Sequence, residues 1–195
     1  MLLPGSQLIN LPVLSLQTGS EVARTRNYVI NPDNLYIEAI ELSGPNLVST
    51  PAFLRIEDIR EISEMGIIID SSDEIVELDD IINLKTLYLS GFEINGIKVV
   101  DESKNKLGKV NGIVLNSASF IVQQISVQRP LLRSLGDTEL LIHRGQIINV
   151  TKDLIAINSS KEKLTKKAKA AYKFANPFRA NQPTPSRPES STTNQ

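Results

Sequence analysis

Cysteine is absent from the 195 residues of this chain, and histidine occurs only once. Without cysteine there is no disulfide framework, no thiolate metal site and no cysteine nucleophile. The one histidine, His143, supplies too few ligands for a zinc site, which normally uses three or four nitrogen or sulfur atoms. No GxSxG or HExxH motif accompanies it. We therefore expect no metal and no cofactor, and we expect His143 to face outward at the end of a strand.

Long hydrophobic runs are also missing. No stretch approaches the roughly 18 apolar residues that a membrane span needs. The first residues, "MLLPGSQLINLPVLSLQTG", have no basic residue ahead of the apolar ones, and two prolines, a glycine and an asparagine interrupt them. This pattern predicts a first strand and not a signal peptide. We therefore expect a cytoplasmic protein, a location that the lack of cysteine also fits.

Charge is nearly balanced over the whole chain but not along it. The formal net charge is −1, yet residues 161–195 hold eight Lys and Arg against two acids. That segment carries +6, so residues 1–160 carry −7. An acidic body with a basic tail is therefore a feature that a functional hypothesis has to explain.

The sequence repeats itself at a nearly constant spacing. The segment "EVARTRNYVINPDNLYIEAIEL" from Glu21 aligns with "KLGKVNGIVLNSASFIVQQISV" from Lys106 at an offset of 85 residues. Further on, "EISEMGIIID" from Glu61 aligns with "NVTKDLIAIN" from Asn149 at an offset of 88 residues. Identity is low, but apolar positions and turn residues coincide. The sequence therefore predicts two copies of one structural unit.

Each copy has the local signals of β-structure. Short β-branched runs such as "NYVINP" and "GIVLNS" end in turn-forming residues. Several short strands separated by polar turns are typical of a small barrel or sandwich. The predicted fold class is therefore all-β dominated, with two tandem small β-barrels.

Residues 77–91, between the two copies, have a different pattern. Apolar residues recur there at helical spacing, Asp79 stands where a helix cap is expected, and Gly91 follows the last of them. We expect a short helix that packs between the two barrels or seals the first. Its apolar positions are Ile81, Leu84, Leu87 and Tyr88. The acids of "SSDEIVELDD" favour a solvated turn and a helix N-terminus, with cation binding or partner docking as the alternative.

The segment "DESKNKLGKVNGIVLN", residues 101–116, contains a turn between two strands. Gly108 allows a positive φ angle or close packing of the backbone. A phosphate-binding loop would need more glycines and a helix after the turn. We therefore predict that Asp101 and Gly108 belong to a structural turn. In the first copy, "LQTGSEVART" has Ala23 in place of the glycine.

The segments "INGIKVVDESKNKLGKVNGIVLN", "SFIVQQISV" and "LLIHRGQIINVTKDLIAINS" resemble the PRC-barrel family. This family is defined by the small β-barrel that the reaction-centre H subunit shares with the C-terminal half of the ribosome maturation factor RimM. The resemblance covers about residues 6–160 as a tandem pair, with the first copy more divergent. It implies a non-enzymatic adaptor that presents barrel surfaces to a protein partner.

The segment "SSKEKLTKKAKAAYKFANPF" has the pattern of a basic amphipathic helix. Ser159 and Glu162 stand at capping-box spacing, and an alanine-rich face alternates with lysines. Three roles stay open: a solubilising helix docked on the acidic barrels, RNA or ribosome contact, and attachment to an anionic membrane surface. The last residues, "ANQPTPSRPESSTTNQ", are expected to be disordered.

The predicted organisation is a barrel over residues 1–77, a linking helix over 78–91, a second barrel over 92–159, a basic helix over 160–176 and a disordered tail over 177–195. The favoured function is protein–protein interaction, without enzymatic activity or a small-molecule substrate. The alternative is an RNA- or ribosome-associated assembly factor. Candidate residues for nucleic-acid or partner binding are Lys161, Lys163, Lys166, Lys167, Lys169, Lys173, Arg129, Arg133 and Arg144.

Overall fold

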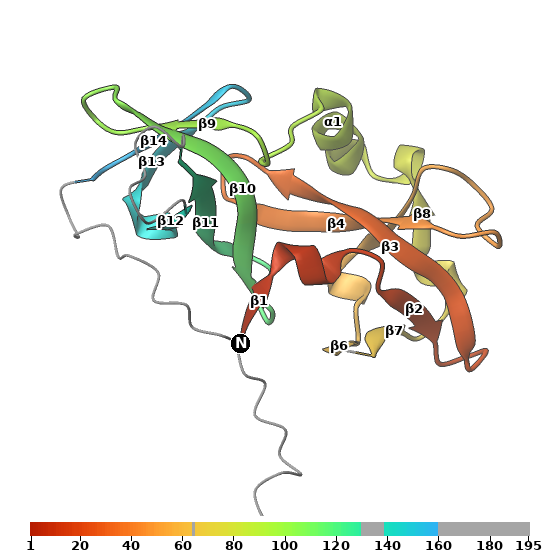
Figure 1. Cartoon of the computed structure of the whole chain (residues 1–195). Helices are drawn as coiled ribbons and strands as arrows, with labels where there is room; N and C mark the ends of the chain where they lie inside the picture. Colours follow the sequence, from red (N-terminus) through yellow and green to blue (C-terminus); the bar gives the residue numbers. More distant parts are fainter. Residues whose placement is uncertain (64, 130–138, 160–195) are drawn as a thin grey trace, which may run out of the picture.

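The computed structural model describes residues 1–63, 65–129 and 139–159 and is dominated by two seven-stranded sheets (Figure 1). Sheet A contains β1 (Leu2–Pro4), β9 (Lys98–Val100), β10 (Lys106–Asn116), β11 (Val122–Gln128), β12 (Glu139–His143), β13 (Ile147–Val150) and β14 (Leu154–Ile157). Sheet B contains β2 (Pro12–Ser15), β3 (Ser20–Asn31), β4 (Tyr36–Ser43), β5 (Ala52–Arg55), β6 (Glu61–Ser63), β7 (Gly66–Ile69) and β8 (Ile75–Glu77). The helices are α1 (Ile82–Ser90) and the 3-10 turns η1 (Gly5–Leu8), η2 (Ile56–Asp58), η3 (Ser72–Glu74), η4 (Leu78–Asp80) and η6 (Arg144–Gln146).

The two halves of the chain have the same strand arrangement. Strands β6-β7-β2-β3-β4-β5 lie in this order in sheet B, and β13-β14-β9-β10-β11-β12 lie in the corresponding order in sheet A. In each half the first and last strands pair in parallel, β2 with β7 and β9 with β14. The offset of 85 residues brings β3 onto β10 and β4 onto β11, while the offset of 88 residues brings η2 onto η6. We call residues 12–69 the first half and residues 98–157 the second half.

The described strands do not form the closed barrels expected from the sequence. One sheet curls into a half-barrel and the other stays open. The ends of the six-strand path in the second half are β12 and β13, which are consecutive in the chain and joined by η6. The same holds for β5, η2 and β6 in the first half. A 3-10 turn therefore joins the two ends where a closed barrel would have a hydrogen-bonded ladder.

The N-terminal segment forms two short strands, with η1 between them. The first, β1, pairs with the C-terminal part of β10, where Leu3 lies opposite Leu115. The amide of Ser117 extends this pairing by donating a hydrogen bond of 2.9 Å to the carbonyl oxygen of Met1. The first residues of the chain thus complete sheet A, although the sequence-based boundaries assign them to the first unit.

The two halves meet at equivalent hairpins. Tyr36 forms an isolated antiparallel bridge with Ile121, which is the residue 85 positions later. The amide of Ile37 donates to the carbonyl of Phe120 at 3.0 Å, and the amide of Val122 donates to the carbonyl of Leu35 at 2.9 Å. The offset of 85 residues maps Ile37 onto Val122 and Leu35 onto Phe120, so it turns each of these bonds into the other. The contact therefore has the self-complementary form of a twofold interface. One hydrophobic cluster runs through both halves across this contact.

Helix α1 covers the outer face of sheet B. Leu84 is buried with Val29, Ala39 and Phe53, and Leu87, Tyr88 and Ile81 pack around them. The rings of Phe53 and Tyr88 meet edge to face, with their centroids 5.0 Å apart. The four apolar positions predicted for the helix therefore all belong to this cluster. Of the two positions predicted for the helix, between the barrels or sealing the first, the structure has it on the sheet of the first half. Gly91 ends the helix in the left-handed conformation, with φ of 63°.

The start of α1 differs from the prediction. The residue before the helix is Ile81, and no side chain caps it. The acids upstream form η4 first, where the amide of Glu77 donates to the carboxylate of Asp80 at 2.8 Å. Asp79, predicted as the cap, instead forms an ion pair of 2.7 Å with Lys85. The carboxylate of Asp80, the acid nearest to the helix, is thus used within η4, and no side chain caps the first amides of α1.

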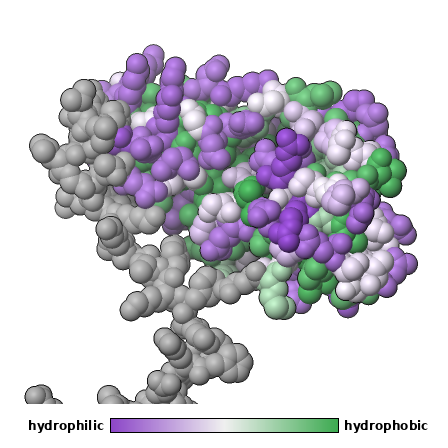
Figure 2. Space-filling model, turned by 45° about the vertical axis from the view of Figure 1, so that its right-hand side comes forward, coloured by the Kyte–Doolittle hydropathy of each residue, from purple (hydrophilic) through white to green (hydrophobic). Residues whose placement is uncertain are grey.

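The surface seen in Figure 2 is mostly hydrophilic, with hydrophobic residues in scattered patches. Of the helices in the described part of the chain, none combines the length and the hydropathy that crossing a membrane requires.

Candidate functional site: a cleft between the two halves

Most of the candidate binding residues named from the sequence lie outside the described residues. These are Arg133 and all six lysines of the basic tail, Lys161, Lys163, Lys166, Lys167, Lys169 and Lys173. Arg129 follows the last residue of β11, and Arg144 begins η6 after β12. Gln128 pairs with Glu139 and Gln124 pairs with His143. The two arginines therefore lie at opposite ends of the β11–β12 pair and do not form one site.

The turn at Asp101 is held by its own side chains. The carboxylate of Asp101 accepts hydrogen bonds from the backbone amide of Asn105 at 2.8 Å and from its side-chain amide at 2.9 Å. These bonds hold the pKa of Asp101 below its ordinary value because they stabilise the charged form. Gly108 lies where the chain approaches the backbone of Gln128, which leaves no room for a side chain. Asp101 thus shapes the β9–β10 turn. Gly108 lies inside β10, opposite Val99, and so not in the turn to which the sequence assigned it.

Among the described residues, His143 and the acidic connector do not form a metal-binding group. His143 is exposed at the end of β12, and its Nδ1 accepts a hydrogen bond of 3.2 Å from the amide of Gly145. This agrees with the outward position predicted from the sequence. Within residues 1–63, 65–129 and 139–159, no three His, Asp or Glu side chains are grouped so that they could hold a metal ion.

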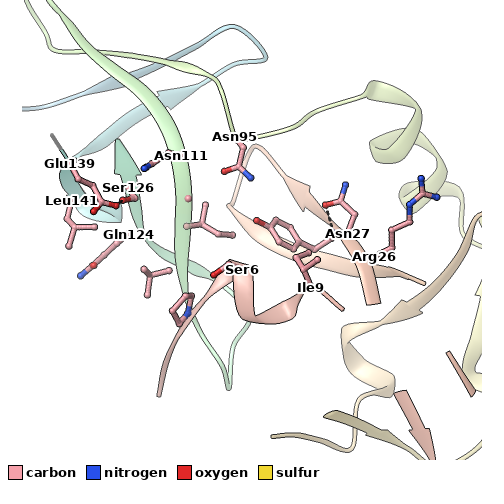
Figure 3. Close-up of a pocket in the computed structure, with 15 residues that line it drawn as sticks. Ser6, Ile9, Arg26, Asn27, Asn95, Asn111, Gln124, Ser126, Glu139 and Leu141 are labelled. Carbon is pink, nitrogen blue, oxygen red and sulfur yellow. Dashed lines mark hydrogen bonds between the residues drawn. The ribbon is translucent and has the colours of Figure 1, made fainter. Parts of the chain in front are cut away.

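A cleft of about 510 Å³, lined by both polar and apolar side chains, lies between the two halves. Figure 3 shows Glu139, Ser126 and Leu141 at one side of it, and Arg26 and Asn27 at the other. Strands β10, β11 and β12 form the first side, and β3 with η1 and the residues after it forms the second. The cleft is therefore built from both copies of the repeat.

Equivalent residues from the two copies line this cleft. Arg26, Asn27 and Tyr28 of β3 correspond to Asn111, Gly112 and Ile113 of β10, at the offset of 85 residues. The cleft consequently lies across the approximate twofold axis that relates the halves. Its two sides differ in chemistry, because a cation and a phenol on β3 face an amide and an aliphatic side chain on β10.

Several polar groups in the cleft already have partners. The hydroxyl of Tyr28 hydrogen-bonds the side chain of Asn95, and burial raises the pKa of Tyr28 above its ordinary value. The hydroxyl of Ser126 donates to a carboxylate oxygen of Glu139. The guanidinium of Arg26 lies 3.4 Å from the buried carboxylate of Glu41 while its side chain stays 69% exposed. Arg26 therefore remains accessible to a ligand in the cleft.

The sheet A side of the cleft corresponds to the face of sheet B that α1 covers. Ala39 and Phe53, which pack under α1, are equivalent to Gln124 and Leu141 in the cleft. The strand pairing supports this equivalence, because Glu41 faces Phe53 as Ser126 faces Leu141. In the second half Gln124 thus replaces Ala39, whereas Leu141 and Val114 keep the apolar character of Phe53 and Val29.

The cleft residues were not among the candidates chosen from the sequence, although a signal for them exists. Where the first copy has Ala39 and Phe53, the second has Gln124 and Leu141. Comparing the two copies position by position would have marked this face as different. The sequence does not indicate that β3 lies beside this face of sheet A, because that arrangement depends on the contact between the two hairpins.

In comparisons with known proteins, no family model matches the chain and no curated protein matches it.

Proposed function

We propose that this chain is a non-enzymatic protein-interaction module and that a partner docks on the outer face of sheet A, in the cleft. The observation that carries this proposal is the difference between the equivalent faces of the two sheets. Helix α1 packs on the face of sheet B, whereas the described residues on the same face of sheet A leave a cleft of about 510 Å³. A folded module presents such a face to a partner.

The lining of the cleft defines the chemistry of the partner. Side-chain amides from Asn27, Asn111 and Gln124 offer both donors and acceptors, and Arg26 offers an exposed cation. Leu141 and the aliphatic residues of β10 supply a small apolar floor. This combination suits a protein segment with one small apolar anchor, an acidic residue and exposed backbone polar groups.

Photo-crosslinking from the cleft tests the proposal. A photoreactive amino acid at Leu141 should link the full chain to one protein in cells, and the same probe at Val48, which is 99% exposed in a loop, should not. Leu141→Arg should lower recovery of that protein at least tenfold, because it places a charge on the apolar floor. Val48→Arg is the matched control. Equal crosslinking from both positions, or full recovery with Leu141→Arg, would rule out the cleft as the docking surface.

We propose further that each half is a PRC-barrel domain. The support is the running order of the second half: a strand, an acidic turn, Leu107-Gly108-Lys109-Val110, a long strand and a short terminal strand. The equivalent order in the first half supports a tandem pair. An experimental structure of the chain, superimposed on PRC-barrels of known structure, tests this assignment. A different strand order in that structure would exclude it.

The alternative function is an RNA- or ribosome-associated role that uses the basic tail. Its support is the position at which the tail begins. Ser159 is held at the β9–β10 turn, because its amide and hydroxyl donate to the carboxylate of Glu102 at 2.8 and 3.0 Å. The last described residue before the segment 161–195, which has a net charge of +6, therefore lies near Lys106, the first residue of β10.

A further inference from the structure

Four cations surround one depression on the second half. Lys98 of β9, Lys106 and Lys109 of β10, and Arg129 after β11 line a hollow of about 340 Å³, together with Gly108 and Gln128. We call these four residues the basic cluster. Lys98 and Lys109 lie directly opposite each other in the β9–β10 pair. Two like charges in this position repel each other, so the arrangement costs stability.

Ion pairs with the described residues do not neutralise three of these charges. None of the ion pairs within residues 1–63, 65–129 and 139–159 involves Lys98, Lys109 or Arg129. Two acids on the neighbouring segments, Glu102 and Glu139, accept hydrogen bonds from neutral groups of Ser159 and Ser126 and form no ion pair with these three residues. Among the described residues, Lys98, Lys109 and Arg129 therefore carry positive charge that no ion pair offsets.

The equivalent place in the first half provides an internal comparison. The strand pairing sets Pro12 opposite Arg24 where Lys98 lies opposite Lys109. Glu21 stands where the second copy has Lys106, and its carboxylate forms an ion pair of 2.8 Å with Arg24. Gly44 stands in place of Arg129. The same fold is thus compatible with a neutral surface, so strand geometry does not require four cations here.

The shape and the surroundings of the basic cluster limit which classes of ligand it can bind. Aliphatic stems of the lysines and the backbone at Gly108 form the hollow, and no aromatic side chain among the described residues lines it. Stacking with bases and interfacial anchoring in a membrane both rely on aromatic or large apolar residues. Ser159 is held at the turn that precedes Lys106, and the basic segment 161–195 follows it in the sequence. A surface of this kind fits an extended polyanion.

We infer that the basic cluster binds the phosphodiester backbone of RNA, without preference for base sequence. The inference rests on the alternative, RNA-associated function and adds a binding surface in the folded second half to the tail. Lysines and arginines bind such a backbone by releasing its condensed counterions, so binding weakens as salt increases. The exchange Lys98→Gln with Lys109→Gln removes two of the four cations and the repulsive pair, and it leaves every acid unchanged.

Fluorescence anisotropy of the full chain with a labelled oligouridylate tests the inference. The double variant K98Q/K109Q should bind about 20-fold more weakly at ~0.1 M salt, and the slope of log K against log salt should fall by about 1.4. The control R24Q/K85Q removes two cations of the first half and of α1, and its affinity should change less than threefold. The unfolding midpoint of K98Q/K109Q should be unchanged or raised, which separates lost binding from lost folding.

Each other outcome has a definite meaning. If only Lys166→Glu, Lys167→Glu and Lys169→Glu weaken binding, the tail alone holds RNA and the cluster inference is overturned. If anionic vesicles bind through the cluster and the oligouridylate does not, RNA is the wrong ligand and the inference is overturned in favour of a membrane surface. If neither set of substitutions matters, both the inference and the RNA-associated function fail, while the protein-docking proposal is unaffected.

Discussion

A single glycine, Gly108 of β10, lets this strand approach β11 closely near the β9–β10 turn. A Cβ atom on Gly108 would lie 2.1 Å from the carbonyl oxygen of Gln128. The first half has Ala23 at the equivalent position, and there the opposite residue is Gly44, where an added Cβ atom would lie 3.3 Å from Cα of Ala23. In each copy a glycine thus provides the space for the close approach of two strands. The glycine is on the first of the two strands in the second half and after the second of them in the first half.

The short distance between Gly108 and Gln128 predicts that Gly108→Ala strongly destabilises the fold. The new methyl group forces the backbone of β10 away from Gln128, at an expected cost of about 2–4 kcal/mol. Gly112→Ala is the matched control, because its Cβ would lie 3.8 Å from Cβ of Ser126, in ordinary contact. The control should change the free energy of unfolding by less than about 1 kcal/mol. Urea unfolding of both variants provides the measurement, and similar losses in the two would refute the packing argument.

Turn residues were the most predictable part of the sequence at this scale. Asn31 and Asn116 end the equivalent strands, and their side chains accept hydrogen bonds from the amides of Asp33 and Ala118. Short polar side chains that bond their own turn give a signal that a sequence pattern retains. Leu35 and Phe120 were not predictable in the same way. Both have positive φ angles, of 57° and 51°, which large residues rarely adopt, and both lie where the two hairpins contact each other.

The elements differ in how far their sequence determines them. The helix α1 lies within the predicted range, whereas β3 and β10 are longer than the short β-branched runs predicted, since they begin already at Ser20 and Lys106. Strand β1 has only three residues, and no local pattern identifies β10 as its partner across more than a hundred residues. The cleft depends on that long-range arrangement as well. Local patterns thus predicted the repeat, whereas contacts between the copies had to come from the structure.

Helix α1 should stabilise the first half through one buried side chain. Leu84 is 4% exposed beneath the helix, whereas Leu89 on the opposite side is 67% exposed. Leu84→Ala should lower the free energy of unfolding by about 2–4 kcal/mol, because it removes buried methyl groups and leaves a cavity. Leu89→Ala should change it by less than about 0.5 kcal/mol. Thermal or urea unfolding compares the two, and an equal effect would show that α1 does not pack firmly on sheet B.

At the scale of the whole molecule, the shared core predicts that both halves unfold together. Phe120 is 5% exposed and lies where the two hairpins meet. Phe120→Ala should cost about 3–5 kcal/mol and should speed hydrogen exchange in β4 of the first half as well as in β11 of the second. Hydrogen exchange followed by mass spectrometry of peptides from each half measures this. Faster exchange confined to the second half would show that the halves are energetically independent.

The two surfaces described for the second half adjoin each other but are lined by different residues. The cleft lies between the halves, whereas the basic cluster lies around the β9–β10 corner. Gln128 belongs to the basic depression, and its register neighbour Glu139 belongs to the cleft. A protein partner and a polyanion can therefore occupy the second half through different residues, and substitutions at one surface should leave binding at the other intact.

The pairing of β1 with β10 has a consequence for the order of events during synthesis. Leu2 to Pro4 leave the ribosome well before their partners, since Leu3 pairs with Leu115. At about 5–20 residues per second, the first strand waits on the order of 6–20 seconds for the strand it joins. During that interval its apolar residues are open to chaperones. Strand β1 is therefore synthesised before the other strands of sheet A but can pair only after β10 has been made. A pause in translation before residue 116 would prolong the exposure of β1.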